Sequence, residues 1–121
     1  MQKLSENEWL IMNALWKAEN FSLGEVFEEV NKSITWSKNT VHTYLTRMQA
    51  KGLVKIEKRS KKPYSANVSK QECADVECDA LLHNVYAGQT SELLTAFLKK
   101  SSITKQERDE LLKLLDDMQV N

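Results

Sequence analysis

Apolar residues recur at helical spacing along several stretches of the chain, and most of these stretches open with a recognisable helix start. Ser5 and Glu8 have the spacing of a capping box, in which each side chain accepts a hydrogen bond from the other residue's backbone N–H. Ser22, Ser69 and Thr104 repeat this pattern, and Ser37 marks a fifth start. Together these signals predict helices over residues 5–18, 22–32, 37–51, 69–86, 90–100 and 104–118.

Two short segments alternate apolar and polar residues, which is the pattern of half-buried strands. Val54 and Ile56 alternate with charged residues, and Tyr64, Ala66 and Val68 alternate with polar ones. The two segments would form a hairpin that follows three helices. Because the second and third helices are joined by a short turn, this order predicts a winged helix-turn-helix. The expected fold class is mainly α with a small β hairpin.

The helices near the C-terminus contain more apolar residues than a small three-helix domain could cover. We therefore expect pairing with a second copy of the chain. This interpretation divides the chain into a winged-helix DNA-binding domain over residues 1–69 and a helical dimerisation domain over 70–121. The residues expected at the dimer interface are Val85, Tyr86, Leu93, Leu94, Phe97, Leu98, Leu111, Leu114 and Leu115.

Charge is distributed unevenly, although the formal net charge of the chain is zero. Residues 1–70 contain 12 basic and 7 acidic residues, whereas residues 71–121 contain 5 basic and 10 acidic ones. Between residues 32 and 62 nine basic residues stand against the single acid Glu57. Such a concentrated basic stretch is what binding to nucleic-acid phosphates requires, although a solvated basic surface is the alternative.

The third predicted helix has the composition of a DNA-reading helix. Val41, Leu45 and Met48 form its buried stripe, and the helix carries no acidic residue. Polar side chains on the opposite side can pair with base edges in a major groove, and cations of the hairpin loop can hold flanking phosphates. The residues predicted to contact DNA are Trp36, Ser37, Lys38, Asn39, Thr40, His42, Thr43, Arg47, Lys51, Arg59, Lys61 and Lys62.

Other classes of function find less support in the residues. The sequence contains no catalytic motif and no glycine-rich phosphate loop, so we expect neither an enzyme nor a bound cofactor. Cys73, Cys78 and His83 are weak metal-ligand candidates, since a spacing of five places neighbours on different faces of a helix. No segment has the length of a membrane span or the pattern of a signal peptide, which predicts a cytoplasmic protein without membrane insertion.

Several of these residues resemble those of the BlaI/MecI family of penicillinase repressors, whose copper-responsive branch is CopY. The similarity begins with Trp9, Met12 and Trp16 in the first helix and continues through Lys51-Gly52-Leu53 and Asn84-Val85-Tyr86-x-Gly88. Its most specific part is the run Trp36-Ser37-x-Asn39-Thr40-Val41-x-Thr43-x-Leu45-x-Arg47-Met48. The resemblance implies a homodimeric transcriptional repressor that binds a palindromic double-stranded operator with TACA/TGTA-type half-sites.

The resemblance also implies two ways of relieving repression, and this chain departs from both. One branch is cleaved in the dimerisation tail after signalling by a membrane sensor protease, commonly between Asn and Phe. The matching bond here joins Ala96 to Phe97, without the Asn. The copper branch binds metal through Cys-x-Cys motifs near the C-terminus, and residues 113–121 contain none. A metal-responsive repressor of the CopY type and a winged-helix protein-interaction module therefore remain as alternatives.

Overall fold

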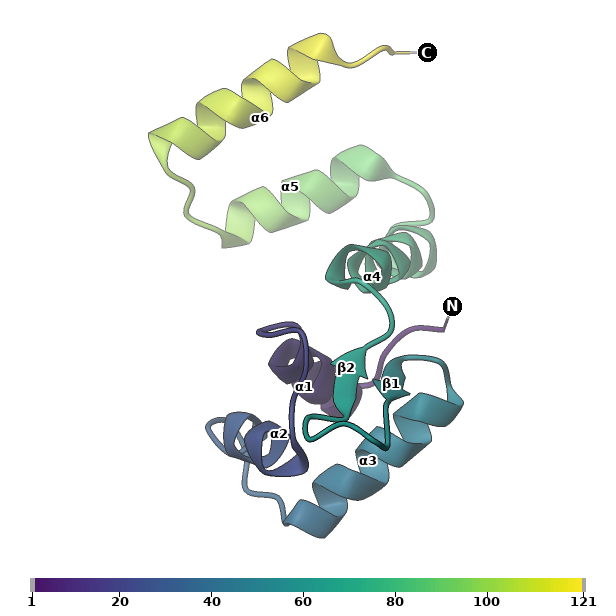
Figure 1. Cartoon of the computed structure of the whole chain (residues 1–121). Coiled ribbons are helices and arrows are strands. Elements are labelled where there is room, and N and C mark those ends of the chain that lie inside the picture. The colour runs from purple at the N-terminus through teal and green to yellow at the C-terminus, as the bar shows by residue number, and fades with distance from the viewer. Residues whose placement is uncertain (1, 121) are drawn as a thin grey trace. The chain divides into compact units, whose positions relative to one another are not determined.

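The computed structural model describes residues 2–120, and it shows six helices and one hairpin within them (Figure 1). The fold class expected from the sequence, mainly helical with a small hairpin, is confirmed. In chain order the elements are α1 (Glu6–Leu15), α2 (Leu23–Val30), α3 (Lys38–Ala50), β1 (Val54–Ile56), β2 (Tyr64–Ala66), α4 (Lys70–Asn84), α5 (Thr90–Lys100) and α6 (Lys105–Asp117).

The predicted helix starts are present, and every helix except α5 ends one to three residues earlier than predicted. Ser5, Ser22 and Thr104 form complete capping boxes at the starts of α1, α2 and α6. Ser69 and Glu72 exchange the same two hydrogen bonds before α4. The first helix ends at Leu15 instead of residue 18, because an apolar pattern marks the buried face of a segment and not its last hydrogen bond.

Contacts between residues divide the chain into two compact units. The first unit contains the residues up to Ala80, and the second begins at Leu81, within α4. In the first unit, residues from α1, α2, α3, the hairpin and the start of α4 form one core, in which Ile11, Met12 and Leu15 are fully buried. Figure 1 shows α3 running along one side of this unit, with α1 and the hairpin next to it.

Two tryptophans of α1 lie at the margin of the core. Trp9 and Trp16 share a face of α1, and their rings meet edge to face with centroids 5.9 Å apart. Both side chains are only partly buried. Trp16 donates its indole N–H to the carbonyl oxygen of Val68 at 3.0 Å. A large ring with a polar N–H is placed well at such a margin, where the N–H reaches an acceptor.

The hairpin is short, and one residue outside it adds an isolated bridge. β1 and β2 pair in antiparallel register, with Lys55 opposite Ser65. Phe21, which precedes α2, forms an isolated bridge with Tyr64 through two backbone hydrogen bonds of 2.8 and 3.0 Å. An isolated two-stranded hairpin is only marginally stable in water, so this bridge and the buried ring of Tyr64 anchor the hairpin to the helices.

Gly52 is the residue that turns the chain from α3 into β1. Its φ is +80°, and an added Cβ would meet no atom within 4 Å. We expect Gly52→Ala to lower the free energy of unfolding by about 1 kcal/mol, since the left-handed backbone is costly for alanine while steric contact adds nothing. Urea unfolding measures this, with Gly24→Ala in α2 as the matched control because the φ of Gly24 is not positive. An unchanged midpoint for Gly52→Ala would contradict this expectation.

The second unit contains α5, α6 and the end of α4. Leu93 is buried, whereas most of the other large apolar side chains from Val85 onward are exposed. Every described residue of α6 is exposed. No helix within residues 2–120 is both long and apolar enough to cross a membrane.

Candidate nucleic-acid interface

One face of α3 is buried in the first unit, and this fixes which face is presented outward. Val41, Leu45 and Met48 are all 0% exposed, as the sequence pattern predicted. Ser37 is the N-cap of this helix, and its hydroxyl oxygen accepts a hydrogen bond from the backbone N–H of Thr40 at 3.1 Å. Because no acidic residue lies in α3, its outward face carries no negative side chain.

The outward face displays polar side chains of the kind that contact base edges. Asn39 and Arg47 are exposed, and Thr43 is partly exposed. The Thr43 hydroxyl donates to the carbonyl oxygen of Asn39 at 2.9 Å, which holds its methyl group in one orientation. The hydroxyls of Ser37 and Thr40 lie 3.0 Å apart at the start of the helix. The side chains of Ser37, Thr40 and Thr43 are therefore held by hydrogen bonds within the helix itself.

Thr46 is an exposed member of this face that the sequence reasoning missed. It follows Asn39 by seven residues and Thr43 by three, so at about 100° per residue it lies on the same side of the helix. The helical spacing alone could have identified it. Thr46 also lines a hollow between α3 and the hairpin, together with His42, Gln49, Ile56, Lys58, Pro63 and Tyr64. His42 is thus placed on the hairpin side of α3.

Lys38 lies at the start of α3 and is directed toward α2. Its ammonium group is 5.7 Å from the centroid of the Phe27 ring, within the range of a cation–π contact. The side chain remains exposed, so it can reach a phosphate near the start of the helix.

The loop of the hairpin carries three predicted phosphate contacts in two different environments. Arg59 and Lys61 are exposed and form no ion pair within residues 2–120. Lys62 pairs with Glu25 of α2, with its Nζ 3.2 Å from Oε2. The backbone N–H of Ser22 and the Lys62 ammonium both donate to Glu25 and lower the pKa of its carboxyl group. Lys62 therefore connects the loop to α2.

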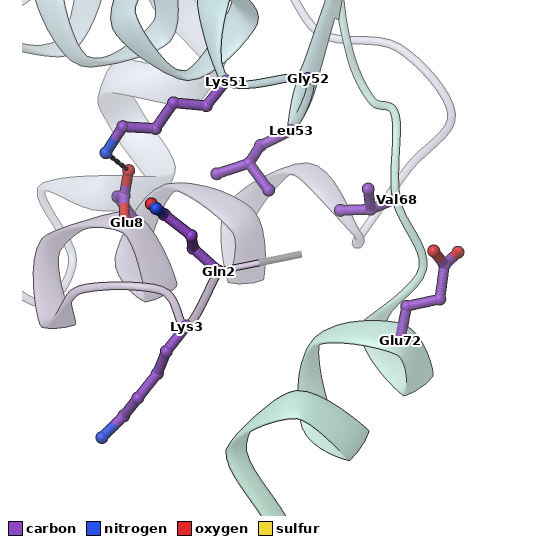
Figure 2. Close-up of a pocket in the computed structure, with 8 residues that line it drawn as sticks. All are labelled: Gln2, Lys3, Glu8, Lys51, Gly52, Leu53, Val68 and Glu72. Atoms are coloured by element: carbon purple, nitrogen blue, oxygen red, sulfur yellow. Dashed lines mark hydrogen bonds and ion pairs between the residues drawn. The ribbon is translucent and has the colours of Figure 1, made fainter. Parts of the chain in front are cut away.

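Lys51, at the end of α3, pairs with Glu8 of α1 (Figure 2). Its Nζ lies 2.8 Å from Oε2 of Glu8, whose side chain is only 8% exposed, while the Lys51 side chain is 56% exposed. Burial opposes ionisation of Glu8, but hydrogen bonds from Lys51 and Ser5 outweigh it and bring the pKa of this carboxyl below its usual value. The Lys51 side chain is thus paired with Glu8 and is still exposed enough for a phosphate to approach it.

Aromatic stacking secures the other end of α3. The rings of Trp36 and Tyr44 are parallel to within 4°, with centroids 4.9 Å apart. The backbone N–H of Trp36 donates to Oδ1 of Asn31 at 2.9 Å. Asn7 of α1 donates from Nδ2 to the Tyr44 hydroxyl at 2.8 Å. Trp36 therefore lies just before the N-terminus of α3 and is partly buried against this helix.

The residues predicted for dimerisation are mostly exposed in the single chain. Leu94, Phe97 and Leu98 of α5 are 43–50% exposed. Leu93 differs because it is already buried within its own chain. The remaining exposed members of the predicted set are Val85, Leu111, Leu114 and Leu115, and Tyr86 is partly buried.

The Ala96–Phe97 bond lies in the interior of α5. Ala96 is partly buried and Phe97 is exposed. A peptide bond in a helix must be unwound before a protease can hold it in an extended conformation.

The two cysteines occupy different environments on α4. Cys73 is buried in the core of the first unit and Cys78 is exposed. Burial, followed by the charge of Glu72, raises the pKa of the Cys73 thiol. Among residues 2–120, no group of three or more His, Cys, Asp or Glu side chains is arranged to hold a metal ion.

Comparisons with known proteins show the family to which this chain belongs. The penicillinase repressor family model matches residues 4–117. The penicillinase repressor of Bacillus licheniformis is 27% identical over 116 residues, which cover 95% of this chain and 91% of that protein. The methicillin resistance regulatory protein MecI of Staphylococcus aureus is 27% identical over 115 residues, covering 94% of each chain.

A solved structure with the same architecture is bound to DNA. It is the solution structure of the monomeric form of Bacillus licheniformis BlaI in complex with the blaP half-operator. It shares 29% sequence identity with this chain, aligns with a TM-score of 0.51, and covers 59% of this chain and 88% of that one. The winged-helix architecture is therefore shared with a DNA-bound relative.

Proposed function

This chain belongs to the penicillinase repressor family of DNA-binding transcriptional repressors, and we propose that it binds a palindromic operator as a homodimer. In this proposal α3 of each subunit enters the major groove of one half-site, and the hairpin loop contacts flanking phosphates. The half-sites would be of the TACA/TGTA type that the family resemblance implies. Binding would block access of the transcription machinery to the promoter.

The observation that carries this proposal is the outward face of α3. It presents Asn39, Thr43, Thr46 and Arg47 with no acidic side chain among them. An ordinary solvated helix face mixes acidic and basic residues, because opposite charges three or four positions apart stabilise it. An acid-free polar face instead suits the edges of bases, where Asn pairs with adenine and Arg with guanine. The exposed cations Arg59 and Lys61 extend this positive surface into the hairpin loop.

The apolar surface of the second unit supports the homodimer. Leu94 and Phe97 are three residues apart on α5, so they share one face of that helix, and both are exposed. α6 adds Leu111, Leu114 and Leu115, which are also exposed. Monomeric soluble proteins rarely leave so many large apolar side chains uncovered. A second copy supplies the same surface, and a two-fold dimer matches the symmetry of a palindrome.

The dependence of DNA affinity on salt tests the proposed function. We expect the logarithm of the affinity for a random-sequence duplex to fall steeply and linearly with the logarithm of salt concentration, since each phosphate contact adds about 0.9 to the slope. Replacing Arg59 and Lys61 with Gln should lower the slope by about 2 per subunit. Fluorescence anisotropy with a labelled duplex measures both quantities.

A matched pair of cations elsewhere provides the control for this measurement. Lys99 and Lys100 are exposed at the end of α5, outside the proposed interface, and their replacement with Gln should leave the slope unchanged. Absence of binding, or an affinity that salt does not affect, would refute DNA binding. An equal change of slope for both pairs would show that the hairpin loop has no particular role.

A further inference from the structure

Two adjacent residues in the first turn of α1 hold one edge of α3. Asn7 donates from Nδ2 to the Tyr44 hydroxyl at 2.8 Å, and Glu8 accepts from the Lys51 ammonium through Oε2 at 2.8 Å. Tyr44 and Lys51 are seven residues apart, so they lie on the same edge of α3 and about 10 Å apart along its axis. The two contacts therefore hold α3 at two separate points.

Both partners of these contacts are themselves held in place. The other carboxylate oxygen of Glu8 accepts the backbone N–H of Ser5 at 2.9 Å, so the capping box orients the carboxylate before it meets Lys51. The Tyr44 ring is stacked on Trp36, and this stacking restricts the position of the Tyr44 hydroxyl. Side chains that are already ordered lose little entropy when they form a contact, so they resist displacement of the helix.

The position of this edge connects it to recognition. At about 100° per residue, Tyr44 and Lys51 lie next to Thr40 and Arg47, at the border of the outward face. The core contacts of Val41, Leu45 and Met48 are apolar, and apolar contacts are not directional. They therefore restrict how deeply α3 packs into the core more firmly than they restrict its rotation about its own axis. Hydrogen bonds and ion pairs on one edge are directional and can hold that rotation.

We propose that Asn7 and Glu8 are positioning residues, which set the rotation of α3 through Tyr44 and Lys51 and thereby decide which side chains of α3 reach the bases. This proposal rests on the proposed DNA-binding function and adds two residues of α1 to the residues of α3 and the hairpin loop that were proposed to contact DNA. It makes sequence discrimination depend on a contact between two helices.

Two conservative variants test the positioning role. Tyr44→Phe removes only the hydroxyl that accepts from Asn7 and keeps the ring stacked on Trp36. Glu8→Gln keeps an oxygen for the capping box and removes the charge that pairs with Lys51. We first select a preferred duplex from a random-sequence library with the unaltered protein. We then measure, for each variant, the ratio of the affinity for that duplex to the affinity for random-sequence DNA.

We expect each variant to lower this ratio by about three- to tenfold, and the double variant to lower it further. Tyr44→Phe changes no charge. A lower affinity ratio for this variant therefore cannot come from altered attraction to phosphates. In the same proteins, NMR residual dipolar couplings report the orientation of α3 relative to α1, and we expect both variants to alter it. Glu72→Gln is the control, because Glu72 has the same capping role at α4 and forms no ion pair within residues 2–120.

Each readout can overturn the proposal on its own. An unchanged ratio would show that these contacts do not govern recognition, even if α3 reorients. An unchanged orientation of α3 with a lower ratio would assign the effect to something other than positioning. If the unaltered protein selects no sequence, the proposed function fails, and the couplings alone then decide whether Asn7 and Glu8 orient α3.

Discussion

Replacing Arg47 with Ala should weaken binding to a selected operator by about 1–3 kcal/mol per subunit, with a much smaller loss on random-sequence DNA. Arg47 is exposed on the outward face of α3 and forms no ion pair within residues 2–120. Its guanidinium group is therefore free to make the bidentate contact with guanine that gives base discrimination. Anisotropy titrations with the two duplexes at one salt concentration measure the difference.

Arg59→Ala is the matched control for this prediction. Arg59 is equally an exposed arginine but lies in the hairpin loop, where a phosphate contact is expected. Its loss should weaken binding to both duplexes by similar factors. If Arg47→Ala behaves in the same way, then Arg47 contacts the backbone and base recognition belongs to other side chains of α3.

A double replacement of Leu94 and Phe97 with Glu is expected to separate the dimer and to lower the affinity for a palindromic operator by roughly 10²- to 10⁴-fold. These side chains are 43% and 50% exposed in the single chain, so the charges cost little in a monomer and are strongly unfavourable in an apolar interface. Binding to an isolated half-site should be preserved, because the first unit is unchanged. Light scattering gives the mass, and anisotropy gives both affinities.

Ile34→Glu provides the control for this variant. Ile34 is an exposed apolar residue of the first unit, at 36%, and lies outside the proposed dimer surface. That variant should remain dimeric. A Leu94/Phe97 variant that also remains dimeric would show that the interface lies elsewhere.

Local sequence rules predicted the helix starts because their physical causes are local. A capping box joins residues three positions apart, so Ser5, Ser22 and Thr104 could be read directly, and the structure contains all three boxes. The stripe of Val41, Leu45 and Met48 follows from helical periodicity in the same way and is fully buried. The outward face of α3 is the side of the helix opposite that stripe. Thr46 was missed on this face, although the same periodicity places it there.

The pairing of individual charges could not be predicted in this way. Lys51 and Lys62 looked equivalent to Arg59 and Lys61 as phosphate contacts, since all four lie in one basic stretch. In the structure, Lys51 pairs with Glu8, 43 positions away, and Lys62 pairs with Glu25, 37 positions away. Which cation meets a carboxylate depends on how the helices cross and where the hairpin loop falls.

The helices, the hairpin, the buried stripe of α3 and the basic character of the first half could thus be predicted from the residues, because each depends on near neighbours in the chain or on composition. Other features depend on how the chain packs: Trp9 and Trp16 lie at the core margin, Phe21 bridges to Tyr64, and Asn7 and Glu8 reach α3. These contacts join residues far apart in the chain. They exist only after the apolar faces have packed and set the angles between helices, which no local pattern encodes.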